Sequence, residues 1–425
     1  MKIYKNPERE QWAEIVERPR LDLTRLNDTV SRVLSDIRQR GDEAVRDYEE
    51  RFDHVSLASL LVTGQEFAEA QVAEELEDAI RLAHRNITAF HASQRQEHPQ
   101  VVTSEGVTCW QKDVAIERVG LYIPGGTAPL FSTVLMLAIP AKIAGCGEIV
   151  LCTPPNAEGK VNPAILYAAT VAGVTKVYKV GGVQAIGALA YGTESVPKVY
   201  KIFGPGNQYV MAAKQQVSLH DVAIDMPAGP SEVCVIADET ANAEFVAADL
   251  LSQAEHGIDS QVFLITTSYK VIDDVQKEID RQLDLLPRKE IAQKTLENSQ
   301  FVLVSSIHEA IELSNAYAPE HLIIQTEDYE KVASRVINAG SVFLGKYACE
   351  SAGDYASGTN HTLPTHGYAT TYSGVNLDSY CRKITFQHLS EEGILNIGHA
   401  VELMAEAEQL DAHKNAMTVR IKSLK

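Results

Sequence analysis

Long apolar runs are missing from this sequence of 425 residues. A membrane-spanning helix needs roughly 18 consecutive apolar residues, and no segment reaches that length. The longest apolar segment, Phe131–Ile143, is shorter and contains Pro140. The N-terminus turns at once into a charged amphipathic pattern, unlike a secretory signal peptide. We therefore expect a protein that stays in the cytoplasm and has no membrane partner.

Basic residues are also in short supply. The chain has 38 Lys and Arg against 57 Asp and Glu, a net charge of −19. Nucleic-acid binding requires a basic stripe for the phosphates, and none is visible, so we expect no nucleic-acid partner. The six cysteines show no CxxC spacing. Without an export signal they are expected to be reduced, mostly buried thiols.

Both standard nucleotide-binding motifs are absent, since the chain has no GxGxxG and no GxxxxGK[ST]. Three glycine-containing segments take their place, each after a predicted strand and before a predicted helix. They are GLYIPGGT at 120–127, GGVQ at 181–184 and GPGN at 204–207. Ligands of open parallel sheets bind outside the carboxyl ends of the strands. These loops therefore favour a nucleotide or phosphate site, with plain tight turns as the alternative.

The apolar periodicity predicts two α/β sheets. In the first, strands at 119–123, 148–152, 176–180 and 199–203 alternate with helices at 133–144, 163–171, 184–190 and 207–216. In the second, strands at 232–236, 262–266, 301–304 and 322–325 alternate with helices at 241–255, 269–285 and 307–315. This alternation indicates Rossmann-like parallel sheets with right-handed crossovers. The breaker Met226–Pro230 divides them.

The two ends of the chain are expected to be helical. Asn6 and Pro7 suit a helix start, and the C-terminal tail returns to a helical pattern from about Tyr380. That tail has too few apolar residues for a core of its own, so it must pack on something else. We expect four parts: an N-terminal helical arm at 1–20, a discontinuous α/β domain at 21–118 and 232–378, a second α/β domain at 119–231, and a C-terminal arm at 379–425.

Candidate chemistry begins with a polar segment, GDYASGTNH at 353–361, which carries Asp354 and His361. About a hundred residues upstream, Gln253 and His256 are spaced i, i+3 at a predicted helix end, so they share a face. Oxygen and nitrogen donors of this kind suit a borderline metal such as zinc. The Gln253–His256 pair alone is weak, because such pairs are commonly surface polar groups. We expect Asp249, on the same face, to be a solvated acid.

Two further pairs carry ionisable groups. Glu320 and His321 open a predicted strand, and a neutral imidazole beside a carboxylate suits general-base catalysis. Glu408 and His413 fall in the C-terminal tail, five residues apart. On a straight helix they would point about 140° apart. Either the helix bends between them or only one is functional.

Taken in order, these segments closely resemble the histidinol dehydrogenase family. The motifs that carry the resemblance are GLYIPGG (120–126), GGVQAIGALAYGT (181–193), FGPGN (203–207), DMPAGPSE (225–232), DLLSQAEHG (249–257), NAYAPEHL (315–322) and ESAGDYASGTNHTLPT (350–365). The similarity spans essentially the whole chain. It implies an intertwined homodimer that oxidises L-histidinol to L-histidine through L-histidinaldehyde, using two NAD⁺, water and one zinc ion per subunit, as the final step of histidine biosynthesis.

The resemblance also implies residue roles. The zinc ligands are expected to be Gln253, His256, Asp354 and, from the partner subunit, His413. Glu320 and His321 are expected as the catalytic pair, with His321 as the base and Glu320 activating water. Substrate contacts are expected from the ligands and this pair, together with Ser231, His361 and Glu408. NAD⁺ contacts are expected from Tyr122, Gln184 and Asn207. Another small amino or hydroxy alcohol as substrate, a metal-dependent hydrolase and an inactive scaffold are the alternatives.

Overall fold

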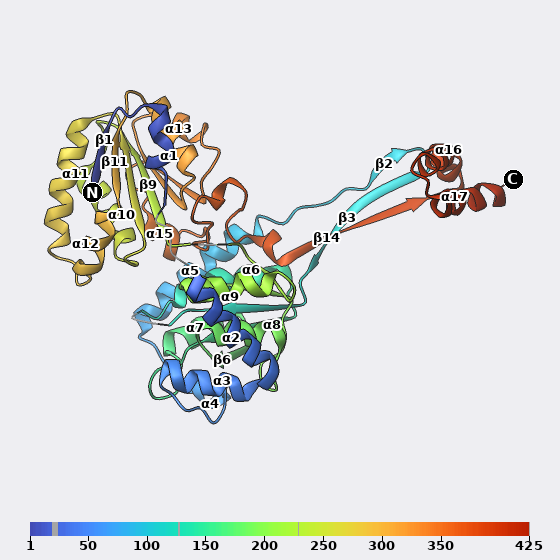
Figure 1. The fold of residues 1–425 in the computed structure, drawn as a ribbon, viewed down its shortest axis with the longest axis horizontal. Coiled ribbons are helices and arrows are strands. Elements are labelled where there is room, and N and C mark those ends of the chain that lie inside the picture. Colours follow the sequence, from blue (N-terminus) through green and yellow to red (C-terminus); the bar gives the residue numbers. More distant parts are fainter. Residues whose placement is uncertain (19–23, 126–127, 228, 425) are drawn as a thin grey trace.

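The computed structural model describes residues 1–18, 24–125, 128–227 and 229–424. Gly126 and Thr127 of the first glycine segment, Ala228 of the breaker and the expected boundary near residue 20 lie outside these residues. The described chain forms two sheet-centred bodies and a long arm that leaves them (Figure 1). Among its helices, none has the length and apolar character needed to cross a bilayer.

The first body is built on a five-stranded parallel sheet in the order β6-β5-β4-β7-β8. Its strands are β4 (Arg118–Tyr122), β5 (Glu148–Thr153), β6 (Lys176–Lys179), β7 (Lys201–Phe203) and β8 (Ala223–Ile224). Its crossover helices are α6 (Phe131–Ala144), α7 (Pro163–Ala172), α8 (Gly182–Tyr191) and α9 (Gln208–Ser218). Alternate residues of β5 face opposite sides: Val150 and Cys152 join one core, Ile149 and Leu151 the other. Helices cover both faces, as a parallel sheet requires.

The N-terminal helices belong to this first body, which differs from the expected grouping of 21–118 with 232–378. They are α2 (Thr24–Arg40), α3 (Asp42–Tyr48), α4 (Gly64–Glu69) and α5 (Glu74–Ala92). Val30 and Ile37 of α2 pack in one core of the five-stranded sheet, and Ile80 and Ile87 of α5 pack in the other. An apolar helix stripe specifies burial but not which sheet buries it, so the sequence could not assign these helices.

The second body is built on a six-stranded parallel sheet in the order β1-β11-β10-β9-β12-β13. Its strands are β1 (Lys2–Lys5), β9 (Glu232–Ala237), β10 (Gln261–Thr266), β11 (Gln300–Leu303), β12 (His321–Gln325) and β13 (Ser341–Leu344). Its helices are α1 (Trp12–Ile15), α10 (Ala243–Ala254), α11 (Tyr269–Leu283), α12 (Lys289–Glu297), α13 (Ile307–Tyr317), α14 (Tyr329–Ala333) and α15 (Glu350–Tyr355). The predicted α/β class is confirmed for both sheets.

The expected helical arm at 1–20 is only partly right. Trp12 and Ile15 are buried in a helical turn, but the chain opens with β1, which pairs with the edge strand β11. In both sheets the earliest strand of the βα succession is central. β9 lies between β10 and β12, and β4 lies between β5 and β7. Each sheet therefore winds outward in both directions, as in doubly wound folds.

The arm contains a three-stranded antiparallel sheet in the order β14-β3-β2. Its elements are β2 (Val101–Ser104), β3 (Val107–Ala115), β14 (Cys381–Leu389), α16 (Glu391–Ala407) and α17 (Asp411–Ser423). The expected direct return to helix near Tyr380 is wrong, because β14 comes first. Most residues of β14 are exposed, so it lacks the apolar alternation that reveals a strand. The arm projects away from both bodies (Figure 1).

Candidate active site

Glu320 and His321 lie at the amino end of β12, beside the start of the central strand β9. Both side chains are buried, at 5% and 4% exposed. Glu320 Oε2 accepts a hydrogen bond from the Glu232 backbone N–H at 3.0 Å. Gly340 packs against the Glu320 backbone so closely that a Cβ at position 340 would lie 2.5 Å from the Glu320 carbonyl oxygen. Backbone from two neighbouring segments therefore holds Glu320 and His321 at the amino ends of the strands.

Three carboxylates surround the His321 imidazole. Nδ1 lies 3.6 Å from Glu320 Oε2 and 3.9 Å from Glu350 Oε1, and Nε2 lies 3.7 Å from Asp354 Oδ1. Burial lowers the pKa of His321, but the charges of Glu350, Glu320 and Asp354 outweigh it and raise that pKa to about 10. Burial raises the pKa of Glu320 to about 7 and that of Glu350 to about 8. The site thus concentrates titratable groups with strongly shifted pKa values, and the pKa values of the two glutamates are shifted toward neutral pH.

A possible metal site adjoins this imidazole. The ligand atoms of His256, Glu350 and Asp354 all lie within 4.8 Å of one another. Glu350 and Asp354 are i, i+4 on α15, and His256 lies just beyond the end of α10. Glu350 was not among the predicted residues. Its position one turn before Asp354 was the signal that could have found it.

Gln253 lies in the last turn of α10, which packs against α15. It is fully buried, and within the described part of the chain neither its Nε2 nor its Oε1 has a hydrogen-bond partner. An unpaired buried amide is costly, and a bound ion relieves that cost. His256 keeps an exposed edge, while the protein atoms packed around it lower its pKa and favour the neutral imidazole that metals bind.

Asp354 completes the same donor set as an anion. Burial raises its pKa, but the hydrogen bond and charge of His321, with the nearby imidazoles, outweigh this and lower it. The residues present therefore fit a divalent cation that accepts nitrogen and oxygen ligands. Asp249 is not the solvated acid that we expected. It is 7% exposed, accepts from Gln325 Nε2 at 3.3 Å, and burial raises its pKa to about 7.

His361 connects this site to the first body. Its Nδ1 lies 2.9 Å from the Asp354 carbonyl oxygen and its Nε2 lies 3.1 Å from Thr133 Oγ1 on α6. A carbonyl oxygen can only accept, so Nδ1 carries the hydrogen and Nε2 of the neutral ring accepts from the Thr133 hydroxyl. Burial lowers the pKa of His361, which favours that neutral ring. Ser231 directly precedes β9, so it lies at the same amino-terminal end of the strands as Glu320.

Glu408 and His413 do not reach this site within one chain. Both are exposed on the distal part of the arm (Figure 1). Glu408 follows the end of α16 at Ala407, and His413 lies in α17, which begins at Asp411. Gln409 between them has a positive φ of 60°. The chain therefore bends between the two residues, which was one of the two alternatives.

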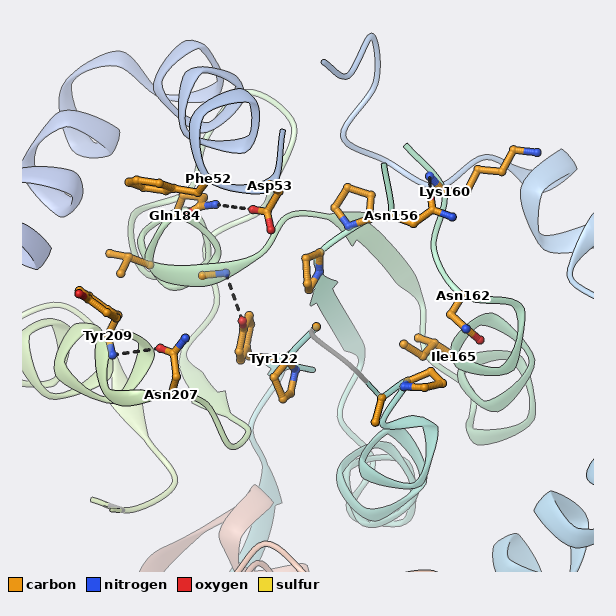
Figure 2. Close-up of a pocket in the computed structure, with 18 of the residues that line it drawn as sticks. Phe52, Asp53, Tyr122, Asn156, Lys160, Asn162, Ile165, Gln184, Asn207 and Tyr209 are labelled. Carbon is orange, nitrogen blue, oxygen red and sulfur yellow. Dashed lines mark hydrogen bonds between the residues drawn. The ribbon is translucent and has the colours of Figure 1, made fainter. Parts of the chain in front are cut away.

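A cavity of about 820 Å³ lies at the carboxyl ends of the five-stranded sheet. Tyr122, Gln184 and Asn207 all line it, from the three glycine-containing segments (Figure 2). Tyr122 Oη accepts from the Gly182 backbone N–H at 3.1 Å. The loops after β4 and β7, on either side of the point where the strand order reverses, both contribute to its wall. That position is the usual ligand crevice of open parallel sheets.

Two acidic residues at this cavity were not predicted from the sequence. Asp53, from the π-helical turn Glu49–Asp53, lines the cavity, and its Oδ2 accepts from Gln184 Nε2 at 3.3 Å (Figure 2). Glu49 Oε1 accepts from the same nitrogen at 2.9 Å. No local motif marks these residues, because they come from a helical segment more than a hundred residues before Gln184.

Comparison with known proteins gives one consistent result. The family model described as histidinol dehydrogenase matches residues 16–421. The chain belongs to the histidinol dehydrogenase family. A histidinol dehydrogenase of Bacteroides thetaiotaomicron is 66% identical over 427 residues, covering 100% of both chains. One from Campylobacter jejuni is 49% identical and covers 100% of this chain and 99% of its own.

A solved structure extends the similarity to three dimensions. The crystal structure of histidinol dehydrogenase from Elizabethkingia anophelis superposes with a TM-score of 0.98 at 54% identity. It covers 100% of this chain and 98% of that one. Since the coverage includes residues 379–425, the extended arm is part of the fold shared with this family member.

Proposed function

We propose that this chain oxidises L-histidinol to L-histidine through bound L-histidinaldehyde, using zinc, two NAD⁺ and water, as the final step of histidine biosynthesis. One observation carries the proposal. In a member of the histidinol dehydrogenase family, a buried imidazole, His321, lies within 4 Å of three carboxylates and adjoins a set of nitrogen and oxygen metal donors. The cytoplasmic location expected from the sequence stays a prediction.

Zinc would be held by Gln253, His256 and Asp354, together with His413 of the partner subunit. The unpaired buried amide of Gln253, the neutral ring of His256 and the anionic Asp354 support this ligand set. When bound, zinc orients the imidazole and amine of the substrate, the template role of metal catalysis.

His321 would take the alcohol proton at Nε2, which faces Asp354. An imidazole accepts a proton only when neutral, and Asp354 is one of the charges that hold a proton on this ring. Asp354 would hold this proton less strongly if it also served as a metal ligand. Glu320, with His321, would then draw a proton from the water that adds to the aldehyde. The pKa of Glu320, raised to about 7 by burial, suits such an exchange near neutral pH.

The cavity of the first body would hold NAD⁺, with Tyr122, Gln184 and Asn207 as contacts. NAD⁺, when bound, accepts the hydride in each oxidation. The cavity volume and its place at the strand ends support this role. Ser231 and His361 would contact histidinol, together with Glu408 of the partner subunit. The exposed ends of the arm support a homodimer in which each arm completes the neighbour's site.

The deciding experiment measures NADH absorbance when the zinc-loaded enzyme consumes a known amount of L-histidinol. Two NADH per histidinol are expected. One NADH per molecule would refute the four-electron reaction. A second assay replaces histidinol with simpler amino alcohols. If these react as well as histidinol, another amino or hydroxy alcohol is the substrate, and the chain is a dehydrogenase of that class.

The role of His321 is tested by His321→Asn. Loss of the base should lower kcat by about 10²–10⁴-fold while the bound zinc stays at one per chain. His220→Asn is the matched control, because His220 is exposed after α9 on the other body. Near-normal kcat in the His321→Asn enzyme would reject the base.

Sharing of sites is tested by mixing two inactive variants, His321→Asn and His413→Asn. If each site combines His321 of one chain with His413 of the other, half of the hybrid's sites regain both residues. Random reassortment then restores about a quarter of the wild-type activity. No recovery, in mixtures that contain hybrids by mass spectrometry, would place both residues of a site in one chain.

A further inference from the structure

Glu350 is a buried carboxylate to which the roles above assign no task. It opens α15, is 1% exposed, and its Oε2 has no hydrogen-bond partner among the residues that the structure describes. Its Oε1 lies 3.9 Å from His321 Nδ1, and it shares the cluster of donor atoms with His256 and Asp354. A buried carboxylate oxygen without a hydrogen-bond partner is costly, so its presence in a packed interior calls for an explanation.

The two ring nitrogens of His321 face different surroundings. Around Nδ1 lie three oxygens that can accept a hydrogen: the Glu232 carbonyl at 3.4 Å, Glu320 Oε2 at 3.6 Å and Glu350 Oε1 at 3.9 Å. Nε2 faces Asp354 on the other side. Which nitrogen of a neutral imidazole carries the hydrogen is set by the partner of the other nitrogen. Here the acceptors gather at Nδ1.

Glu350 faces Nδ1 with Oε1, and its Oε2 is buried without a hydrogen-bond partner among the described residues. Glu320 already accepts from the Glu232 backbone and is needed for the water step, while the Glu232 carbonyl is fixed in β9. We propose that Glu350 is a positioning residue that holds the His321 hydrogen on Nδ1 and so leaves Nε2 free to accept the proton of the substrate. The inference rests on the proposed function, in which His321 is the base. Carboxylates orient catalytic imidazoles by this means in other enzymes.

The competing role for Glu350 is that of a further metal ligand, since it lies one turn from Asp354. Two observations favour positioning. Glu350 is more deeply buried than Asp354, whose side chain is 17% exposed. It also faces Nδ1 of His321, whereas Asp354 faces Nε2. The two acids of α15 therefore address opposite edges of one ring.

The first test leaves the chain intact. Nitrogen-15 NMR of the zinc-loaded enzyme with labelled histidine reports which ring nitrogen carries hydrogen, and comparison with His321→Asn assigns the signal among the 13 histidines. The expected result is a His321 ring with hydrogen on Nδ1 and a bare Nε2. Hydrogen on Nε2 overturns the proposal. This readout does not depend on histidinol turnover, so its failure is distinct from failure of the proposed function.

The second test compares Glu350→Gln with Glu350→Asp and with Glu330→Gln, an exposed control on α14. Glu350→Gln should keep one zinc per chain and a histidinol KM within about threefold of wild type, while kcat falls about 10²-fold. Glu350→Asp, which retains a carboxyl group, should recover part of that loss. Unchanged kcat overturns the proposal, and loss of zinc identifies Glu350 as a ligand instead. If Glu350→Gln does not fold, the NMR result decides.

Discussion

The buried ion pair between Lys214 of α9 and Asp225 should be essential to the cavity of the first body. Its Nζ and Oδ1 lie 2.6 Å apart, and the two side chains are 1% and 2% exposed. Lys214 Nζ also donates to the Gly204 carbonyl at 2.7 Å, and Asp225 Oδ2 accepts from the Gly204 N–H at 2.8 Å. Gly204 starts the loop that ends in Asn207. The pair therefore clamps one wall of the cavity.

Removing one partner leaves the other charge buried and unpaired, which lowers the free energy of unfolding by about 3–5 kcal/mol. Asp225→Asn should cost more than Lys214→Met. It leaves an ammonium with neutral acceptors and no counter-charge, whereas Lys214→Met leaves a carboxylate with two backbone donors, Gly204 and Met226. For a domain of this size, 1 kcal/mol shifts Tm by about 2–4 °C, so each single variant should melt about 6–20 °C lower. The double variant leaves no stranded charge and should lose less than the sum.

Differential scanning calorimetry of the three variants supplies the stability comparison, and titration of NAD⁺ by fluorescence supplies the Kd. We expect NAD⁺ to bind more weakly in both single variants, because Asn207 is then less firmly placed. Losses that add to within about 0.5 kcal/mol in the double variant would refute the coupling. A Tm shift below about 2 °C in both single variants would refute the clamp itself.

Three further predictions follow from single contacts. Thr133→Val removes the hydroxyl that faces His361 Nε2 and should raise the histidinol KM several-fold with little change in NAD⁺ affinity, as steady-state kinetics would show. Burial raises the pKa of Glu49 from its usual 4.5 to about 7, so the stability from its protonated form is complete below about pH 4.5 and is lost as the pH rises through 7. Glu49→Gln should therefore flatten the fall of Tm between about pH 4.5 and 7, and an unchanged slope would contradict that origin. His256→Asn should lose zinc and activity together by metal analysis and NADH assay, and full activity without bound metal would count against the ligand role.

Much of the fold could be read from the sequence because buried parallel strands are nearly continuous apolar runs. The strands β4, β5, β9 and β10 were all predicted within one or two residues, since Val, Ile and Leu fill both of their faces. The strands of the arm were not predicted, because they are not buried apolar runs. β14 is exposed along most of its length and pairs with β3 far earlier in the chain. An exposed strand has no burial pattern of its own.

The site followed a different rule. Glu320, His321 and Asp354 stand in motifs long enough to be recognised, and the chain folds so that they surround one point. Glu49 and Asp53 were missed because each acts across a distance in sequence that no local pattern encodes, whereas Glu350 was missed although it lies one helical turn before Asp354. Glu49, for example, meets Gln184 at a separation of 135 residues. Burial of these carboxylates is a property of packing, which only the folded chain reveals.

The two bodies divide the proposed chemistry between them, and α6 joins their sites. Pro124 and Pro129 line the cavity, and α6 begins two residues later. Its first turn presents Thr133 to His361, and the Asn360 amide donates to the Met136 carbonyl at 2.6 Å. The polar segment at 353–361, with the proposed substrate contact His361, therefore packs on α6, which follows one of the loops that line the cavity. Glu320, His321 and Asp354 nevertheless belong to the second body, at the start of β12 and on α15. In the proposed reaction, NADH could then leave the first body while the aldehyde keeps its contacts on the second, as two successive oxidations at one site would require.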